Sequence, residues 1–353
     1  MKEVVLVLLA LVCFSLACET PSAQGGEYNS VGTGVREAVC FVYHRFGDNR
    51  YPSTNVSTEN FAQHLKFLKD NSYEVLTLAD AVDYLRNGTA NRKVAVITVD
   101  DGYKSFLTGA MPLLKQYGYP ATLFINTETV GSGSYLDWNE LKQIVRHGVE
   151  IGNHSHSHDY FLNNDKDKQL TLFKEDVKKA QRIIKEQLDV EAATFAYPYG
   201  EYTPEMALAV KEMGFKAAVA QNSGVMQTNT DLYTLPRYPM AHNYADINGF
   251  KEKARMSALR VKSESPSSVL LSENPPKLEV EFSNNDIDAA RLQCFVQGGS
   301  CDLEILSKQP LKVKITAKAP LKRRRTLYTL TIPSKNGGWR WYSHLWVRPE
   351  VKE

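Results

Sequence analysis

Two patterns of hydrophobic and polar residues divide the chain. Between Ala38 and Arg237, short apolar runs alternate with segments of helical period. The runs that predict strands are AVCFVY, VAVITV, ATLFI, GVEIG, ATFAY, KAAVA and LYTLP. The helical patterns between them cover residues 58–71, 104–117, 138–147, 174–188 and 204–213. Strands that alternate with helices in this way predict parallel α/β architecture, here a (β/α) barrel, regular or distorted.

A different pattern follows the residues around Ala254. The stretch LRVKSESPSSVLLSENPPK predicts a connector, and the later segments alternate apolar and polar residues between Asn-, Gly- and Pro-containing turns. The predicted strands there are LEVEFS, ARLQCFVQ, LEILS, LKVKITA, RTLYTLTIP and WRWYSHLWV. We therefore expect one domain over residues 38–254 and a small antiparallel, sandwich-like β-domain over 255–353.

The N-terminus predicts export. An apolar run from Val4 to Ala17 follows Lys2 and ends on small residues, which is typical of a signal peptide over residues 1–17. Either Cys18 is lipidated after cleavage at a lipobox-like site, or an ordinary signal peptidase cuts there. Residues 18–37 would form a flexible linker. The predicted location is periplasmic, extracellular or membrane-anchored through lipid.

Cysteine content, the length of the apolar runs and net charge further restrict the classes of protein that the sequence allows. Export would permit a disulfide between Cys294 and Cys301, although two unpaired buried thiols remain an alternative. The run Val4–Ala17 is too short to span a bilayer comfortably, and no later stretch is long enough, which argues against a multi-pass membrane protein. Forty-two Lys and Arg against 40 Asp and Glu leave a net charge of +2, so a nucleic-acid partner is not expected.

Polar residues with catalytic potential follow the predicted strands directly. Asp100 and Asp101 come after VAVITV, the histidines of NHSHSHDY after GVEIG, and Tyr199 after ATFAY. His44 and Arg237 follow the first and last runs. The carboxyl ends of barrel strands lie on one face, so we expect these side chains to converge.

The convergent residues predict a metal site. His154 and His158 are four residues apart, a spacing that places both imidazoles on one face of a helical turn, whereas His156 would point elsewhere. Two imidazoles and one carboxylate leave positions open for water and substrate, as a catalytic zinc site requires. A second carboxylate could then take a proton from water. Spacing alone does not decide which aspartate binds the metal, and a structural Asp-Asp-Gly turn beside a solvated histidine loop is the alternative.

These motifs resemble those of the NodB-type polysaccharide deacetylases, carbohydrate esterase family 4. Thr98-Val99-Asp100-Asp101-Gly102 is similar to the first motif, and His154 to His158 to the second. Ala196-Tyr197-Pro198-Tyr199-Gly200 matches the third in part. The resemblance implies a distorted (β/α) barrel, Asp100 as general base, and Asp101, His154 and His158 as metal ligands. It also implies that the Tyr199 backbone N–H stabilises the oxyanion.

The chain departs from the family pattern at two positions, and each missing residue needs a replacement. Ala196 stands where the family has an Arg that orients the catalytic Asp, and Arg237 is the predicted replacement, with a surface charge as the alternative. The segment in which the family's general acid normally lies is not recognisable, and His242 is the nearest candidate for the proton donor. Tyr43-His44-Arg45 and the Phe-Ala-Tyr-Pro-Tyr-Gly form of the third motif resemble the poly-N-acetylglucosamine deacetylase subgroup.

The sequence therefore predicts a metal-dependent hydrolase that removes N-acetyl groups from an N-acetylglucosamine-containing polysaccharide. The expected cofactor is a divalent ion, with Zn²⁺ preferred and Co²⁺ or Ni²⁺ compatible. The alternatives are a non-catalytic glycan-binding protein and an O-acetyl esterase. The polymer, its linkage, protein partners and oligomeric state are not identified. In the C-terminal domain, we expect the aromatic residues of WRWYSHLWV to form core and the run Lys322–Arg325 to be a solvated hairpin.

Overall fold

The computed structural model describes residues 34–335 and 337–352. The expected signal peptide, the lipidation site at Cys18 and nearly all of the expected linker lie outside these residues. The described residues all fall within one compact unit. Among the described helices, none combines the length and the apolar character needed to span a bilayer.

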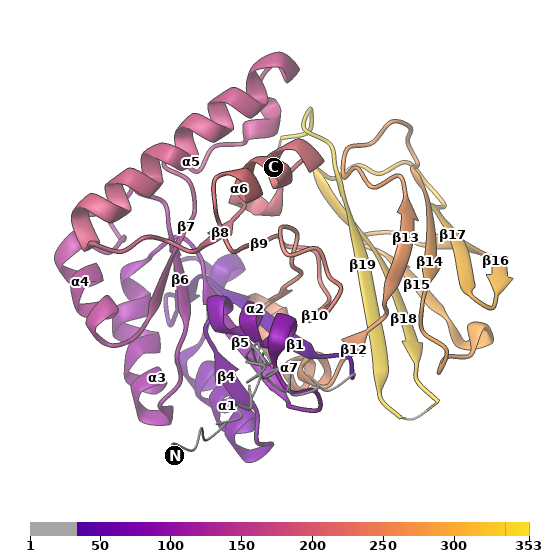
Figure 1. Ribbon diagram of the computed structural model, residues 1–353, viewed down its shortest axis with the longest axis horizontal. Helices are drawn as coiled ribbons and strands as arrows, with labels where there is room; N and C mark the ends of the chain where they lie inside the picture. Colours follow the sequence, from indigo (N-terminus) through magenta and orange to yellow (C-terminus); the bar gives the residue numbers. More distant parts are fainter. Residues whose placement is uncertain (1–33, 336, 353) are drawn as a thin grey trace, which may run out of the picture. The chain divides into compact units, whose positions relative to one another are not determined.

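The larger sheet is a curled, mainly parallel sheet whose strand order is β10-β1-β5-β6-β7-β8-β9, with β4 beside β5 and β11 beside β1 (Figure 1). The antiparallel member is β10 (Val225–Gln227), which pairs with the start of β1. The parallel strands are β1 (Glu37–Tyr43), β4 (Glu74–Leu76), β5 (Val94–Val99), β6 (Thr122–Ile125), β7 (Glu150–Asn153), β8 (Thr194–Ala196), β9 (Ala217–Val219) and β11 (Tyr238–Pro239). A two-stranded sheet is made by β2 (Arg45–Phe46) and β3 (Asn55–Val56). This curled sheet confirms the predicted distorted barrel.

Amphipathic helices connect these strands and cover the sheet. They are α1 (Thr58–Asp70), α2 (Leu78–Asn87), α3 (Met111–Tyr117), α4 (Trp138–Arg146), α5 (Lys166–Leu188), α6 (Pro204–Glu212) and α7 (Ile247–Ala254). Polar caps set their starts: the Ser57 and Thr77 side chains accept backbone N–H bonds, and Asp137 forms a capping box with Glu140. Central strands such as β5 are buried along their whole length, as expected for a parallel sheet.

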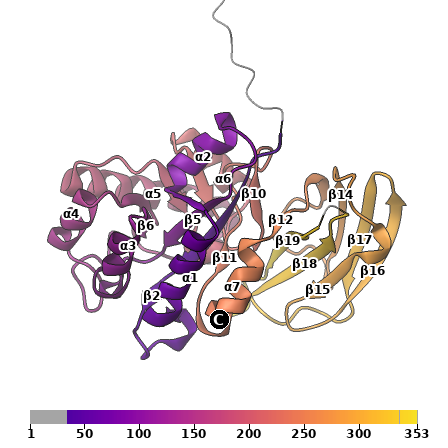
Figure 2. The same cartoon turned by 90° about the horizontal axis from the view of Figure 1, so that it is seen from below.

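The C-terminal part is a β-domain of two four-stranded sheets (Figure 2). One sheet has the order β12-β19-β18-β15, with β12 (Ser257–Ala258), β15 (Gln293–Val296), β18 (Arg325–Pro333) and β19 (Trp339–Val347). The other has the order β13-β14-β17-β16, with β13 (Val261–Ser265), β14 (Lys277–Phe282), β16 (Cys301–Lys308) and β17 (Leu311–Ala317). Side chains of both sheets share one hydrophobic core, so the predicted sandwich-like domain is confirmed.

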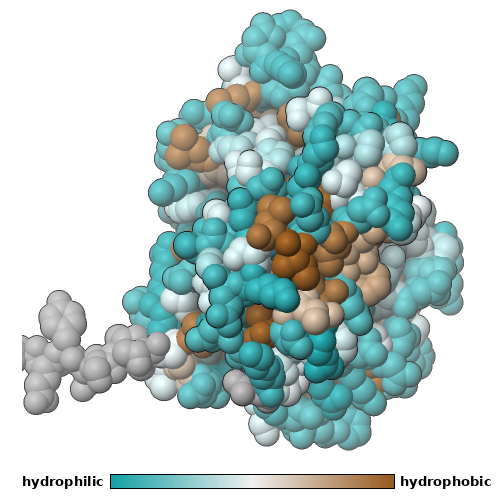
Figure 3. All heavy atoms as spheres, turned by 90° about the vertical axis from the view of Figure 1, so that its right-hand side faces the viewer, coloured by the Kyte–Doolittle hydropathy of each residue, from teal (hydrophilic) through white to brown (hydrophobic). Residues whose placement is uncertain are grey.

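The cysteine and aromatic predictions for this domain have mixed outcomes. Cys294 and Cys301 form a disulfide between β15 and β16, which was one of the two alternatives. Trp346 is a core residue, whereas Trp339 is 39% exposed, so the expectation of a wholly buried aromatic segment is wrong at its first position. Figure 3 shows an apolar patch on one face of the molecule among mostly hydrophilic side chains. The exposed large hydrophobic residues of the domain are Phe295, Ile305, Leu306 and Trp339.

Several expected elements differ. LYTLP is not a strand: its backbone is a turn held by Asp231, and Pro236 provides no N–H, so Leu235 makes only an isolated bridge to Val219. The predicted connector contains β13, which is solvent-exposed on much of its surface. The sequence also did not predict the short elements β4, β10, α2 and α7, although α2 buries Leu78, Ala81, Val82 and Leu85 at helical spacing.

Candidate metal centre

The first motif lies at the carboxyl end of β5. Asp100 follows the strand, is completely buried, and its backbone N–H donates to the Tyr43 carbonyl at the end of β1 over 2.9 Å. Asp101 and Gly102 then adopt left-handed backbone conformations, with φ values of 74° and 73°. This sharp turn points the two neighbouring carboxylates in different directions, which resolves the repulsion expected if they faced each other.

The histidine motif forms a loop after β7, and not the helical turn that the spacing predicted. Ser155 and His158 have positive φ values of 67° and 55°, which are incompatible with a helix. The loop is held from outside by Asp176 of α5, whose carboxylate accepts from the backbone N–H groups of His156 and Ser157. The Ser155 hydroxyl accepts from the His158 N–H over 3.0 Å.

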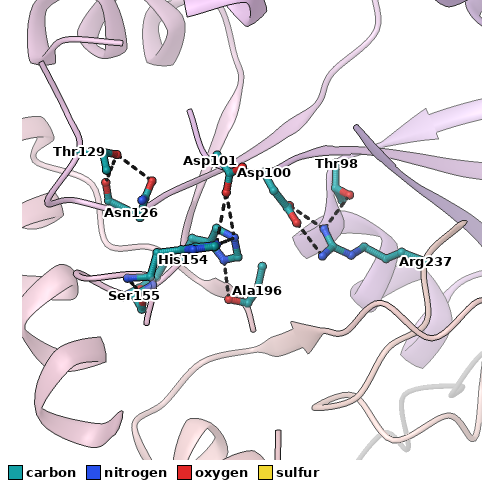
Figure 4. Close-up of polar contacts among 11 residues, drawn as sticks. Thr98, Asp100, Asp101, Asn126, Thr129, His154, Ser155, Ala196 and Arg237 are labelled. Carbon is teal, nitrogen blue, oxygen red and sulfur yellow. Dashed lines mark hydrogen bonds and ion pairs between the residues drawn. The ribbon is translucent and has the colours of Figure 1, made fainter. Parts of the chain in front are cut away.

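Three ligand atoms meet in front of these two loops (Figure 4). Asp101 Oδ1 lies 3.4 Å from His154 Nε2 and 3.4 Å from His158 Nε2, and the two imidazole nitrogens are 3.2 Å apart. Atoms that each lie about 2.1 Å from one ion in near-tetrahedral geometry are separated by about 3.4 Å. The side chains present therefore fit a single divalent ion, with two nitrogen donors and one oxygen donor.

The surroundings orient His154 for this role. Its Nδ1 donates to the Ala196 carbonyl over 2.7 Å, which leaves Nε2 directed at the ligand cluster (Figure 4). Burial opposes protonation of His154, but the hydrogen bond that its protonated ring donates to Asp101 and the charges of both aspartates outweigh it, so its pKa is raised. Burial, together with the charge of His154, lowers the pKa of His158 to about 4. Burial would raise the pKa of Asp101, yet the nearby histidines hold it below its usual range.

Arg237 reaches the other aspartate. Its Nη1 and Nη2 donate to Asp100 Oδ1 and Oδ2 over 2.7 and 2.8 Å, and both side chains are 0% exposed. Further donors bond to the Ala220 carbonyl and the Thr98 hydroxyl, which fixes the guanidinium. Arg237 is therefore not a surface charge. Burial raises the pKa of Asp100, but Arg237 and His154 outweigh this effect, so the pKa lies below its ordinary value.

Tyr199 lies in a short turn after β8, beside the histidine loop. Its φ is 59°, and Gly200 follows with a φ of 72°. A Cβ on Gly200 would lie 2.6 Å from Gln221, so only glycine fits there. The Tyr199 ring packs edge-on against His158 with 4.6 Å between centroids. The third motif thus borders the ligand cluster.

The other histidines take different positions. His156 bonds through Nδ1 to Thr127 Oγ1 over 2.8 Å, outside the ligand cluster. His242 is exposed, in a short turn before α7, with a φ of 49°. His44 is partly buried after β1, whose last residue Tyr43 pairs with Val99 at the end of β5. The sequence placed His44 at this face without giving it a role.

Aromatic residues that the sequence analysis missed flank the aspartates. The Arg45 guanidinium lies between the rings of Tyr51 and Tyr103, at 3.9 and 3.4 Å from their centroids. Tyr103 also contacts Tyr135, with centroids 4.8 Å apart. Tyr103 directly follows the Asp-Asp-Gly motif, and this adjacency was the available signal. Beside His158, Tyr160 stacks on Tyr199 with 3.6 Å between ring centroids.

Comparison with known proteins agrees with this geometry. A family model described as polysaccharide deacetylase matches residues 87–218, which include all three motifs. The poly-β-1,6-N-acetyl-D-glucosamine N-deacetylase of Staphylococcus aureus (strain MRSA252) is 27% identical over 229 residues, covering 60% of this chain and 79% of its own. The structure of IcaB from Ammonifex degensii matches with a TM-score of 0.55 and 25% identity over 62% of this chain and 97% of its own. The segment that contains the three motifs therefore matches the polysaccharide deacetylase family.

A further solved structure supports the fold of this deacetylase. The Streptococcus pyogenes deacetylase PplD, in complex with acetate, has a TM-score of 0.57 and 22% identity, covering 63% of this chain and 99% of its own. The Staphylococcus aureus relative named above is a poly-β-1,6-N-acetyl-D-glucosamine N-deacetylase, which is the subgroup that the motifs of this chain resemble. The predicted family and enzyme class are thereby confirmed.

Proposed function

We propose that this deacetylase is a metal-dependent hydrolase that removes N-acetyl groups from an N-acetylglucosamine-containing polysaccharide. One observation carries the proposal: a three-atom ligand cluster lies directly beside Asp100, a buried carboxylate that is not needed as a ligand. Ligands, a spare base and a backbone oxyanion donor in one place are the components of metal-assisted amide hydrolysis.

Asp101, His154 and His158 would hold the ion, and when bound it supplies Lewis acidity at the acetyl carbonyl. The donor set of two imidazoles and one carboxylate suits Zn²⁺, and Co²⁺ and Ni²⁺ also fit.

Asp100 acts as the general base that accepts a proton from the attacking water. Arg237 keeps this carboxylate ionised and fixes its orientation through two hydrogen bonds. The backbone N–H of Tyr199 donates to the oxygen on which negative charge develops.

The leaving amine needs a proton, and we assign its donor to His44. His44 directly follows β1, whose last residue Tyr43 pairs with Val99 at the end of β5, so it leaves the sheet beside Asp100. His242 remains the alternative from the sequence, but it is exposed. A histidine is suited to this step because its ordinary pKa lies near neutrality.

Aromatic residues near the ligand cluster support a sugar polymer as substrate. Tyr103, Tyr135, Tyr160 and Tyr199 are partly exposed, so they can contribute contacts to a sugar ring. The similarity to a poly-β-1,6-N-acetyl-D-glucosamine N-deacetylase supports an N-acetylglucosamine polymer. Export and possible attachment to a membrane through Cys18 remain part of the proposal.

The test is acetate release from N-acetylglucosamine oligomers by the protein supplied with Zn²⁺, Co²⁺ or Ni²⁺. Asp100→Asn is expected to abolish release while retaining metal, because it changes the base and leaves the ligands intact. Asp302→Asn, at an exposed position of β16, is the matched control and should leave release unchanged. Release only from O-acetylated glycans would identify an esterase, and tight binding without release would identify a glycan-binding protein. Either result would overturn the proposal.

A further inference from the structure

The basic run Lys322–Arg325 of the β-domain is only in part the solvated segment that the sequence predicted, because Lys322 and Arg323 are exposed whereas Arg324 is buried. Arg324 is 4% exposed and contacts the parallel-sheet domain close to Tyr199. We propose that the C-terminal β-domain completes the catalytic site, with Arg324 as the positioning residue that holds Glu201 and thereby the turn carrying the Tyr199 N–H. This inference deepens the function proposed above and rests on it.

Hydrogen bonds from all three nitrogens of the guanidinium hold Arg324 in place. Its Nε and Nη2 donate to the two carboxylate oxygens of Glu201 over 2.7 and 2.8 Å, and both side chains are 3% exposed. Nη2 also donates to Asn163 Oδ1, and Nη1 donates to the carbonyls of Pro349 and Val351. A guanidinium has five N–H donors, and these five bonds match that capacity. A lysine could not reproduce this planar, two-point contact.

Glu201 follows the strained part of the third motif. Tyr199 and Gly200 both have left-handed backbones, and a non-glycine residue in this region costs about 1–3 kcal/mol unless its surroundings hold it there. On the N-terminal side, Tyr197 anchors the turn, because its hydroxyl donates to the Tyr233 carbonyl over 2.9 Å. On the C-terminal side, the Glu201 carboxylate provides the anchor, and its partners come from the β-domain.

Aromatic contacts connect the same arginines to the ligand cluster. The Arg324 guanidinium lies 4.2 Å from the centroid of the Tyr160 ring, which stacks on Tyr199 with an interplanar angle of 6°. Arg325 adds a bond to Glu201 over 3.1 Å and lies 5.5 Å from the Tyr199 ring centroid. Tyr199 in turn packs against His158. The β-domain therefore supports both the backbone and the ring of the oxyanion residue.

This arrangement predicts a specific kinetic consequence. An oxyanion donor contributes mainly in the transition state, so a displaced Tyr199 N–H lowers kcat more than it changes KM. A contact that only joined two domains would alter stability without changing the turnover of folded molecules. The distinction makes the role of Arg324 measurable.

The experiment compares Arg324→Met with Arg340→Met in the full chain loaded with Zn²⁺. Arg340 forms a comparable ion pair with Asp286 over 2.6 Å, but this pair lies within the β-domain. We expect Arg324→Met to lower kcat by about tenfold to a hundredfold, with KM within about twofold and metal content unchanged. Arg340→Met should lower the melting temperature while keeping kcat. Arg324→Lys, which keeps the charge, guards against misfolding and should show an intermediate loss of kcat.

A second readout does not depend on turnover. The backbone N–H groups of Gly200 and Glu201 donate to the Tyr197 and Pro198 carbonyls, and their hydrogen exchange should accelerate in Arg324→Met but not in Arg340→Met. Equal kcat in the two folded variants, or unchanged exchange in the turn, would overturn the inference. If the unmodified protein releases no acetate, the proposed function fails, whereas the exchange measurement still reports on the positioning of the turn.

Discussion

The Arg237 guanidinium and the Asp100 carboxylate form a fully buried, two-point ion pair at the centre of the site. Arg237 immediately precedes β11, which adds to the sheet beside β1, so the cation reaches Asp100 from the opposite side to the third motif. Ala196, at the position of the family's usual Arg, instead uses its carbonyl to orient His154. Two different segments of the chain therefore orient Asp100 and His154.

Replacing Arg237 with Met is expected to shift the pH dependence of catalysis. Burial alone raises the pKa of Asp100, and Arg237 is the largest influence that lowers it. Without the guanidinium, the base becomes protonated at a higher pH, so the acidic limb of kcat/KM moves upward. Removing one partner of a buried ion pair also costs about 3–5 kcal/mol of folding stability. Measurement requires pH–rate profiles and urea unfolding curves.

Arg50→Met serves as the control, because Arg50 pairs with Asp48 on the surface and is 72% exposed. It should leave both the profile and the stability nearly unchanged. An Arg237→Met protein with the original acidic limb would show that Asp100 does not depend on this guanidinium.

Two single variants, His44→Gln and His242→Gln, distinguish the candidate proton donors. His44→Gln is expected to lower kcat by about a hundredfold, because general acid catalysis contributes on the order of 10²–10⁴. His242→Gln should have little effect, since His242 is exposed. Steady-state kinetics on an N-acetylglucosamine oligomer, with metal content measured in parallel, provides the comparison. The reverse ranking would assign the donor to His242.

Metal affinity should weaken on acidification. The aspartates raise the pKa of His154, and a proton on its Nε2 competes with the ion. Affinity is therefore lost as pH falls through this raised pKa, at a higher pH than for an isolated histidine. Titration against a chromophoric chelator from pH 8 to 5 tests this expectation. His156→Gln, outside the cluster, should give the same curve, and a pH-independent affinity would contradict the assignment of His154 as a ligand.

His64 predicts an acid-dependent loss of stability away from the site. It is fully buried: Tyr43 Oη donates to its Nδ1, its Nε2 donates to the Ala245 carbonyl, and its ring stacks on Phe250. Burial lowers its pKa from 6.5 to about 4. Between these values the unfolded chain binds more protons than the folded chain, so the free energy of unfolding decreases as pH falls, by about 3 kcal/mol in total.

Urea unfolding at pH 7.5 and pH 5, in the presence of chelator, measures this effect. His64→Phe removes the titrating group, so the pH dependence of its unfolding free energy should be smaller, whatever its absolute stability. An unchanged slope would show that His64 is not the titrating residue.

Short apolar runs predicted the strands that precede the site residues, because these strands are buried on both faces. VAVITV coincides with β5 at both ends, and the polar residues that follow it are placed as the strand directions require. The helical reading of the histidine motif was wrong because the positive φ values of Ser155 and His158 depend on the Asp176 carboxylate, which is 18 residues further along than His158. The spacing of the histidines alone does not reveal the contact with Asp176.

Arg237 and Arg324 show why one buried arginine was predicted and the other was not. The third motif lacks the Arg that orients the catalytic Asp in the family, so another cation was expected to replace it. Arg237 directly follows the last predicted run, at the face where the site residues were expected to converge. Arg324 stands in a run of four cations, a pattern that usually indicates solvated charge. Its partner Glu201 is separated from it by 123 residues, and only the folded chain brings the two together.

The bonds from Arg324 to the carbonyls of Pro349 and Val351 have a practical consequence for handling this protein. A shortened version ending before Pro349 would remove the acceptors on which this arginine depends. Recombinant material altered at that end could lose turnover for reasons unrelated to metal loading or substrate choice. Assays of acetate release are therefore best run on protein that retains Pro349 and Val351.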